Sequence, residues 1–346
     1  MIELRSDTFT LPTPDMLKAM AAAPLGDDVY GEDPTVRELE ELAATTLGKQ
    51  AACLTPSGTM ANLTAIMAHA PRGAKVLVGD ESDIHIYEAG GASVLGGVVY
   101  EPIRTAPDGT LALDDLARGF PDDPDDPQFA LPALICLENT HNRAGGKVLP
   151  LDYLAEVRRF ADERGVAVHL DGARVFNAAV ASGVPVARIA EHADSVQFCL
   201  SKGLGAPIGS IVAGSAELIT AVRRLRKLLG GGMRQAGVIA AAGILAITTA
   251  HRLAEDHANA RRLAEGLADV DGVQVDPAQV QTNIVMFRVD GFSWRSFVAA
   301  AAAEGLAVGE LGHGRIRAVT HSGVTEADVD RAVTVVRDVV KRGPRG

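Results

Sequence analysis

The feature that most constrains the fold is a series of short apolar runs that alternate with stretches of helical periodicity. After a predicted helix over 36–47, such runs lie at 75–80, 96–102, 133–140, 166–172, 195–203 and 209–214. Short apolar runs bounded by glycine and polar residues are typical of buried strands, and helices between them complete βαβ units. The pattern predicts an α/β domain with a mostly parallel sheet.

The rhythm changes after residue 223, where a basic helix end and three consecutive glycines occupy 223–235. An alanine-rich helix over 236–250 and an amphipathic helix over 251–270 follow. Strand-like runs at 273–276, 282–290 and 315–320 then alternate with predicted helices over 293–305 and 326–342. We predict a large domain over 1–248, with an extended N-terminal segment, a short helix over 14–23 and a loop over 26–35. A small α+β domain over 249–346 completes the chain.

Composition excludes several classes of partner. The 346 residues include 33 basic and 44 acidic side chains, a net charge of −11, so no overall positive field attracts nucleic acid or an anionic membrane. The three cysteines form no CxxC pair, and neither a disulfide framework nor a metal site is predicted. No signal peptide and no run of about 18 apolar residues is recognisable. We expect a cytoplasmic protein with a small-molecule substrate.

Lys202 and Asp171 form the most informative pair. Each lies at the end of a predicted strand, and their separation of 31 positions corresponds to about one βαβ unit. Alone, Lys202 would be read as a solvated surface lysine and Asp171 as a helix cap. Together at strand ends that line one crevice, they match an amine that captures a carbonyl and a carboxylate that holds a pyridinium nitrogen. In a partly desolvated site we expect the ammonium form of Lys202 to be disfavoured.

A phosphate site should accompany such a pair. Ser57, Gly58 and Thr59 lead directly into an amphipathic helix, whose free N–H groups and dipole favour an anion. A Ser/Gly/Thr turn is more often an ordinary helix cap, so its weight comes from its place one strand before the rest of the site.

Nine blocks of sequence carry a family resemblance. They read LRSDTFTLPT, GDDVYGEDPTV, PSGTMANL, YEAGG, ENTHNRAGGKVLP, HLDGARVFNA, SKGLGAPIGS, GGGMRQAG and IRAVTH, and they run in order from residue 4 to residue 321. The chain resembles the threonine aldolases, within the β-eliminating lyase group of fold-type I pyridoxal phosphate enzymes. The resemblance implies an aspartate aminotransferase-like large domain and a lyase that cleaves L-threonine or L-allo-threonine to glycine and an aldehyde.

The resemblance assigns roles in cofactor binding. Lys202 would hold pyridoxal 5'-phosphate covalently, and Asp171 would face its pyridine nitrogen. Gly58 and Thr59, with Ser57 beside them, would cradle its phosphate.

Roles in substrate binding follow in the same way. Arg174 would lie near the cofactor's phenolic oxygen and the substrate carboxylate, and Ser6 and Arg317 would complete a carboxylate clamp, since an arginine fork binds a carboxylate bidentately. From sequence alone a surface ion pair remains the plainer interpretation of either arginine. His141 is expected near the substrate hydroxyl, where a neutral imidazole can accept or relay its proton.

The family's sites are shared between subunits. Tyr30, Lys227 and Arg234 are therefore expected to reach a neighbouring subunit's site in a homotetramer built as a dimer of dimers. Without the resemblance, residues 223–227 would be interpreted as a solvated basic helix face.

One position departs from the family. Relatives carry a ring-stacking histidine five residues before the glutamate of YEAGG, and here that position is Asp83. His85, two residues later, would share its strand face if this segment is extended and is a candidate substitute. This change leaves open a β-eliminating lyase or a transaldolase acting on another amino acid. A cofactor-binding protein without catalysis is the third hypothesis.

Overall fold

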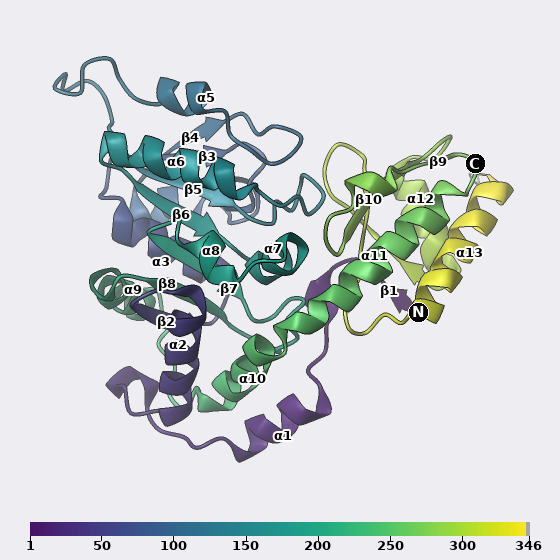
Figure 1. The fold of residues 1–346 in the computed structure, drawn as a ribbon, viewed down its shortest axis with the longest axis horizontal. Coiled ribbons are helices and arrows are strands. Elements are labelled where there is room, and N and C mark those ends of the chain that lie inside the picture. The colour runs from purple at the N-terminus through teal and green to yellow at the C-terminus, as the bar shows by residue number, and fades with distance from the viewer. Residues whose placement is uncertain (344–346) are drawn as a thin grey trace.

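The larger lobe of the computed structural model, which describes residues 1–343, is built on a seven-stranded sheet (Figure 1). The strand order is β2-β8-β7-β6-β5-β3-β4. The strands are β2 (Ala51–Thr55), β3 (Lys75–Gly79), β4 (Val99–Ile103), β5 (Pro132–Glu138), β6 (Ala167–Asp171), β7 (Ser195–Cys199) and β8 (Ser210–Gly214).

The sheet is mostly parallel, as predicted. Strands β4, β3, β5, β6 and β7 run in one direction, and β8 is antiparallel to both β7 and β2. Each of the six predicted apolar runs contains or overlaps one strand. The edge strand β2 was not predicted, because its five residues form a short run directly between two helices. The carboxyl ends of the parallel strands therefore share one edge, where an open α/β sheet binds its ligands.

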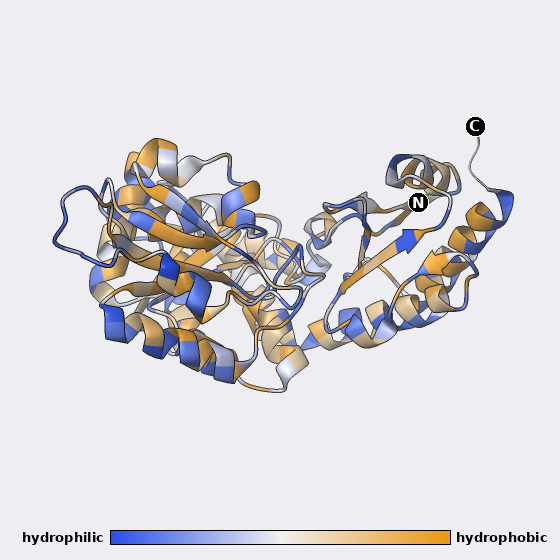
Figure 2. Ribbon diagram, turned by 90° about the horizontal axis from the view of Figure 1, so that it is seen from above, coloured by the Kyte–Doolittle hydropathy of each residue, from blue (hydrophilic) through white to orange (hydrophobic). Residues whose placement is uncertain are grey.

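Helices cover both faces of this sheet. They are α1 (Pro14–Ala22), α2 (Pro34–Leu47), α3 (Gly58–His69), α4 (Asp83–Ile86), α5 (Leu113–Arg118), α6 (Leu151–Arg164), α7 (Val175–Ser182), α8 (Val186–Ala190), α9 (Ala216–Leu228) and α10 (Gly237–Thr248). Leu39, Val157 and Ile189 pack from α2, α6 and α8 into one core, whereas Ile66 and Val222 pack from α3 and α9 into the layers opposite. Figure 2 shows the sheet strands as the hydrophobic interior of this lobe.

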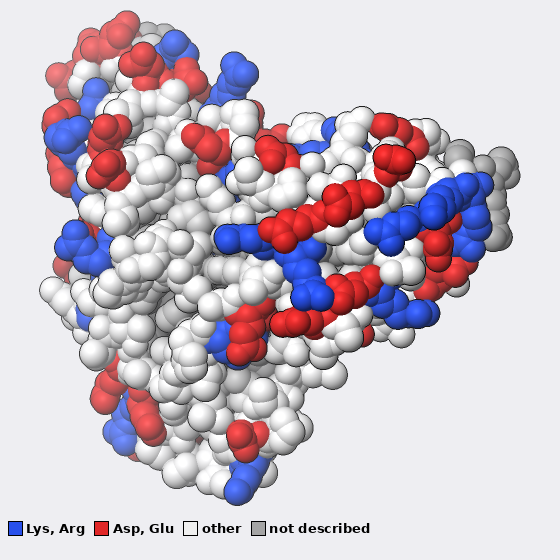
Figure 3. All heavy atoms as spheres, turned by 45° about the vertical axis from the view of Figure 1, so that its right-hand side comes forward, with Lys and Arg blue, Asp and Glu red and all other residues white. Residues whose placement is uncertain are grey.

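The smaller lobe packs three helices against a four-stranded sheet of order β12-β13-β10-β9. The helices are α11 (Leu253–Ala268), α12 (Trp294–Ala303) and α13 (Glu326–Arg342). The strands are β9 (Val273–Gln274), β10 (Ile284–Val289), β12 (Gly309–Glu310) and β13 (Ile316–Val319). Phe287, Phe297 and Val336 are among the residues of its separate core. On the face in Figure 3, acidic and basic side chains are interspersed.

The N-terminal segment crosses between the lobes. Strand β1 (Ile2–Glu3) pairs in parallel with β11 (Leu306–Ala307), and Leu4 is buried in the core of the smaller lobe. The division into domains 1–248 and 249–346 remains a prediction. Strand β1 belongs to the first of these ranges but pairs with a strand of the second. As a result, the residues that follow Leu4 lie between the two lobes.

Among the described residues, no single helix is long and apolar enough to cross a bilayer. The segments Gly237–Thr248 and Ala250–Ala268 reach that length and composition only together, across a bend of 57°.

Candidate active site

A pocket of about 330 Å³ opens at the carboxyl ends of β6 and β7. Asp171 is the last residue of β6, and Lys202 follows β7 by three residues. The start of α3 closes another side of the pocket. Its lining includes Ser57, Gly58, Thr59, Asn62, Asp83, Tyr87, Glu88, Asp171, Gln197, Cys199 and Lys202. The structure therefore brings the predicted lysine, aspartate and phosphate turn to one place.

Asp171 is buried and held by three donors. Asn62 Nδ2 donates to Oδ2 at 2.9 Å, Gln197 Nε2 donates to Oδ1 at 2.9 Å, and the backbone N–H of Ala173 donates to Oδ1 at 3.1 Å. Burial, and next the negative charge of Asp83, raise the pKa of the Asp171 carboxyl. A cation in the pocket would lower the pKa of Asp171 again. A protonated pyridine nitrogen would be such a cation.

Lys202 differs from the sequence-based expectation in its charge. Burial lowers the pKa of its amine, but the neighbouring Cys199 thiol and the carboxylates of Asp83 and Asp7 outweigh burial, so the pKa of Lys202 lies above its usual range. Burial does disfavour the ammonium form, as predicted, and is the largest single effect. The predicted net direction was wrong, because it left out Cys199 and the carboxylates that the fold gathers around this lysine.

The start of α3 forms an anion cradle. Ser57 caps the helix by accepting a hydrogen bond from the N–H of Met60 at 3.3 Å, and Gly58 and Thr59 are the first helical residues. A Cβ atom at Gly58 would lie 2.9 Å from Cys199 Sγ, so only glycine lets the helix start approach β7 this closely. Helix N–H groups at such a start suit a phosphate.

Two further carboxyl groups surround the pocket. Glu88 accepts from Asn62 Nδ2 at 2.9 Å, and burial followed by the charge of Asp171 raises its pKa to about 8. Glu138 is fully enclosed, accepts the N–H groups of Asp83 and Asn142 at 2.7 Å each, and has a pKa well above its usual range because of burial and the charge of Asp83.

Arg174 is paired within the chain. Its Nε and Nη2 donate to Asp7 at 2.8 and 2.6 Å, and both side chains are buried. The two bonds leave Nη1 as the guanidinium nitrogen available to a ligand. Asp7 was not among the predicted site residues, although it stands within the LRSDT block.

Arg317 and Ser6 lie close to the same point. Arg317 Nη1 donates to Asn142 Oδ1 at 2.8 Å, and its Nη2 donates to the carbonyl of Arg5, the residue before Ser6, at 3.0 Å. Burial and next the positive charge of Arg174 lower the pKa of Arg317, so the two guanidinium groups sense one another. An anion between them would be favoured, which suits the predicted carboxylate clamp.

Asp83 lies in the pocket and His85 does not. Residues 83–86 form α4 rather than a strand, because Ser82 starts a helical turn in which the N–H of Ile86 reaches its carbonyl at 3.0 Å. The His85 ring therefore turns away and meets the Tyr100 ring edge-on, with centroids 6.0 Å apart. The expected shared strand face of the two residues is wrong. Asp83 instead accepts from Asn142 Nδ2 at 3.0 and 3.2 Å.

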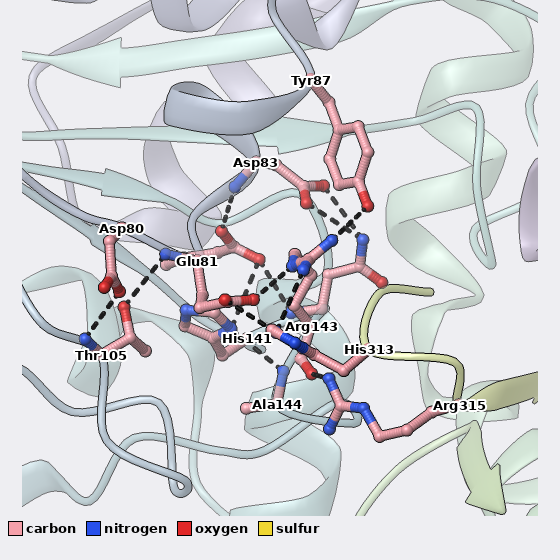
Figure 4. A network of polar contacts seen from close by, with 12 residues as sticks. Asp80, Glu81, Asp83, Tyr87, Thr105, His141, Arg143, Ala144, His313 and Arg315 are labelled. Carbon is pink, nitrogen blue, oxygen red and sulfur yellow. Dashed lines mark hydrogen bonds and ion pairs between the residues drawn. The ribbon is translucent and has the colours of Figure 1, made fainter. Parts of the chain in front are cut away.

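His141 is buried beside this pocket and lines an adjoining cavity (Figure 4). Burial is the largest cause that lowers the pKa of its imidazole, to about 4, so the ring is neutral at neutral pH. The N–H of Ala144 donates to Nδ1 at 3.3 Å, which places the ring proton on Nε2. Nε2 is buried and has no partner within residues 1–343, so it is available as a donor.

The three residues predicted to serve a neighbouring subunit lie outside the pocket of Lys202. Tyr30 is 76% exposed and shares a separate cavity of about 520 Å³ with Lys227. Arg234 pairs with Asp27 at 3.0 Å beside that cavity. Within one chain, none of the three lines the pocket of Lys202.

Sequence reasoning missed the residues that hold Asp171. Asn62 and Gln197 carry no catalytic signal of their own, and only their places relative to Asp171 reveal them. Asn62 follows Gly58 by one helical turn, and Gln197 stands on β7 opposite Asp171 in the strand register. Finding Gln197 required knowledge of which strand neighbours β6, and finding Asn62 required knowledge that the start of α3 faces Asp171.

Comparison with known proteins agrees with this geometry. The model of the β-eliminating lyase family matches residues 3–290. The low specificity L-threonine aldolase of Escherichia coli K12 is 50% identical over 290 residues, which cover 84% of this chain and 85% of that protein. The probable low-specificity L-threonine aldolase 2 of Arabidopsis thaliana is 46% identical over 336 residues, covering 95% and 94%.

A solved threonine aldolase structure has the same fold. The structure of Leishmania major threonine aldolase superposes with a TM-score of 0.83 at 20% identity, covering 98% of this chain and all of that one. The chain belongs to the β-eliminating lyase family and, within it, to the threonine aldolases.

Proposed function

We propose that this chain is a pyridoxal phosphate-dependent aldolase that cleaves L-threonine or L-allo-threonine to glycine and acetaldehyde. The observation that carries the proposal is the pocket that joins Lys202, Asp171 and the start of α3, with Arg174 and Arg317 nearby. The names of the relatives at 46% and 50% identity support the same activity.

The pocket fits pyridoxal phosphate. Lys202 would hold its aldehyde carbon, Asp171 would face its pyridine nitrogen, and Gly58 and Thr59 would hold its phosphate with Ser57. When bound, the cofactor supplies an electron sink for the bond to be broken at Cα. Asn62 and Gln197 fix the Asp171 carboxylate, so its direction is set before the cofactor binds.

The substrate carboxylate would lie between Arg174, Arg317 and Ser6. Because Asp7 fixes the Arg174 fork and Asn142 fixes Arg317, neither guanidinium has to be ordered when the substrate arrives. Such preorganisation reduces the entropy that substrate binding must overcome.

Two groups can handle the proton of the substrate hydroxyl. The Nδ1 bond of His141 favours Nε2–H as a donor to the substrate oxygen, and acceptance of the proton then falls to Asp83. Asp83 accepts only from an amide, so its carboxylate is free of a cationic partner among the described residues.

The elimination and transaldolase alternatives are not favoured, because the relatives at 46% and 50% identity are named threonine aldolases. The intact lysine, aspartate and phosphate turn likewise do not support a cofactor-binding protein without catalysis.

A shared site between subunits is part of the proposal. Tyr30, Lys227 and Arg234 gather on one exposed surface, and Leu228 on that surface is 73% exposed. An exposed apolar side chain next to the cation of Lys227 suits a subunit contact. We propose a dimer of dimers in which these residues complete a neighbour's site, and a cytoplasmic location.

The test is product analysis with the protein loaded with pyridoxal phosphate. We expect equal amounts of glycine and acetaldehyde from L-threonine or L-allo-threonine, with no 2-oxobutanoate. Lys202→Ala should abolish turnover, whereas Lys18→Ala, which removes an exposed lysine of α1, should retain it. Accumulation of 2-oxobutanoate would reassign the chain to elimination, and full activity of Lys202→Ala would overturn the proposal.

A further inference from the structure

A second cavity of about 370 Å³ adjoins the proposed active site and is rich in positive charge. The larger lobe contributes Glu81, His141 and Arg143 to its wall. The smaller lobe contributes Arg288 from β10. It also contributes His313 and Arg315 from the turn between β12 and β13, which Figure 4 shows facing Arg143. Three guanidinium groups therefore face one carboxylate, in a chain whose net charge is −11.

Two of these arginines have no acidic partner. Arg288 Nη2 donates to the carbonyl of His313 at 2.8 Å, and Arg315 Nη2 donates to the carbonyl of Arg143 at 2.7 Å. Neither forms an ion pair within residues 1–343, and Arg315 Nε is buried there without a hydrogen-bond partner. The nearby Glu310 accepts the N–H of Gly314 at 3.3 Å. Buried donors of a charged group without acceptors are uncommon in folded proteins.

Glu81, the one carboxylate among the described residues that line the cavity, is already shared. Glu81 accepts from Arg143 Nε and contacts His313 Nε2 at 2.9 Å. Burial, and next the positive charge of Arg143, lower the pKa of Arg315. Arg288 lowers it further, whereas Glu81 and Glu310 oppose this shift. Within the described part of the chain, the guanidinium groups of Arg143, Arg288 and Arg315 therefore share the charges of only two carboxylates, Glu81 and Glu310, and an anion in the cavity would relieve their repulsion.

The backbone is shaped to hold this arrangement. A Cβ atom at Gly312 would lie 2.2 Å from Arg143 Nη2, so the Arg143 guanidinium rests directly on that glycine. The next residue, His313, has φ of 56°, a conformation that residues other than glycine seldom adopt. This strained turn brings the His313 ring to Glu81 and Arg143, and strain of this kind is retained where the surroundings fix it.

The cavity is connected to the proposed chemistry. His141, which we assign to the substrate oxygen, is part of its wall. Arg143 Nη1 donates at 2.9 Å to the hydroxyl of Tyr87, and Tyr87 lines the pocket of Lys202. A side chain that extends from the β-carbon past His141 would therefore enter a space lined by guanidinium groups.

We propose that this cavity binds a carboxylate or phosphate at the end of the substrate side chain, so that the preferred substrates are β-hydroxy-α-amino acids with an anionic side chain. This rests on the proposed function. Cleavage breaks the Cα–Cβ bond, the electron pair stays at Cα and takes up a proton to give glycine, and the hydroxyl loses its proton to give an aldehyde that carries the anion. No oxidant or reductant is needed.

The test uses the holoenzyme in the direction of synthesis, with glycine and matched pairs of aldehydes. One pair is 4-oxobutanoate against pentanal, and the other is glyceraldehyde 3-phosphate against glyceraldehyde. We expect kcat/KM to favour the anionic aldehyde by about tenfold or more in at least one pair, as charge-assisted hydrogen bonds allow. The pair that responds identifies a carboxylate or a phosphate.

Arg315→Gln should lower this preference about tenfold, whereas Arg331→Gln, an exposed arginine of α13 outside the cavity, should retain it. Binding of succinate and of inorganic phosphate to the holoprotein, measured by calorimetry, should weaken in the Arg315 variant alone. No anionic preference in either pair, or a preference that Arg315→Gln leaves unchanged, would overturn the inference. If L-threonine and L-allo-threonine are cleaved in that case, only this inference fails. If they are not, the proposed function fails and calorimetry still decides whether the cavity binds anions.

Discussion

Asp7 and Arg174, 167 residues apart in the sequence, form a buried bidentate ion pair between the N-terminal segment and the strand-end loop after β6. The pair connects the segment that crosses between the lobes to the pocket of Lys202. The pKa of Asp7 lies well below its usual range: burial alone would raise it, but Arg174 and next Lys202 more than compensate.

Removal of one partner should therefore be costly. Asp7→Asn leaves the buried Arg174 without its counter-charge, and we expect a loss of about 3 kcal/mol in the free energy of unfolding. The midpoint of urea unfolding measures it. Asp15→Asn, an exposed aspartate of α1, is the matched control and should shift the midpoint only slightly.

The same pair predicts an acid dependence. A carboxyl with a depressed pKa stabilises the fold above its unfolded pKa of about 3.9, and this stabilisation is lost as the pH falls below that value. The Asp7→Asn variant should lose this part of the acid sensitivity. Equal midpoints for both proteins at pH 7 would contradict a stabilising role for the pair.

Glu88 should make the protein without cofactor less stable in alkali. Its pKa is raised to about 8, so its contribution is favourable below the ordinary glutamate value and is lost as the pH rises through 8. Glu88→Gln keeps an acceptor for Asn62 and removes the charge. We expect the variant to exceed the wild type in stability at pH 9 by up to about 4 kcal/mol, and to match it near pH 4.

The urea midpoint at several pH values checks this prediction. Glu41→Gln removes an exposed carboxylate of α2 and should leave the pH profile unchanged. A difference between Glu88→Gln and wild type that is the same at pH 4 and pH 9 would show that folding does not raise the pKa of Glu88.

Asp83 should set the pH at which Lys202 becomes reactive. Its carboxylate is one of the groups that outweigh burial and raise the pKa of Lys202. Asp83→Asn should lower that pKa, so that the amine is unprotonated, and captures pyridoxal phosphate, at lower pH. Absorbance titrations of the purified protein with the cofactor between pH 6 and 10 would measure the shift.

The same variant tests proton transfer. If Asp83 takes the hydroxyl proton, Asp83→Asn should lower kcat about 10²-fold or more, with a smaller change in KM. Asp80→Asn, in the neighbouring turn, provides a control outside the pocket of Lys202. A kcat close to that of the wild type would assign proton acceptance to another group.

Mixed oligomers test the shared site. Lys202→Ala lacks the reactive amine, and Lys227→Ala lacks the cation proposed to act in the neighbour's site, so each alone should be inactive or impaired. If a site draws on both subunits, a mixed dimer carries one site with both lysines, and equal mixing should restore about a quarter of the wild-type activity. Activity no higher than the mean of the two separate variants would place Lys227 outside any shared site.

The sequence by itself determined the fold class and the centre of the site. Apolar runs of strand length between helices predict a parallel sheet because burial on both faces requires them, and residues at strand ends must then meet at one edge. Lys202, Asp171 and the turn at Gly58 were therefore predictable before any coordinate was known. The sequence blocks that resemble the threonine aldolases predicted the chemistry of these residues.

The tertiary structure alone decided which residues complete that centre. Asp7 reaches Arg174 only because β1 crosses to the smaller lobe and pairs with β11, and no local pattern encodes that pairing. The sequence also placed His85 beside Asp83, but the hydrogen bonding of α4 turns the two side chains apart. Lys202 is buried as expected, yet its pKa rises because Cys199, and then carboxylates from distant segments, outweigh burial. Local sequence preferences determine the helices and strands. The charge states and contacts of the site residues depend instead on long-range packing, which brings together groups that are far apart in the chain.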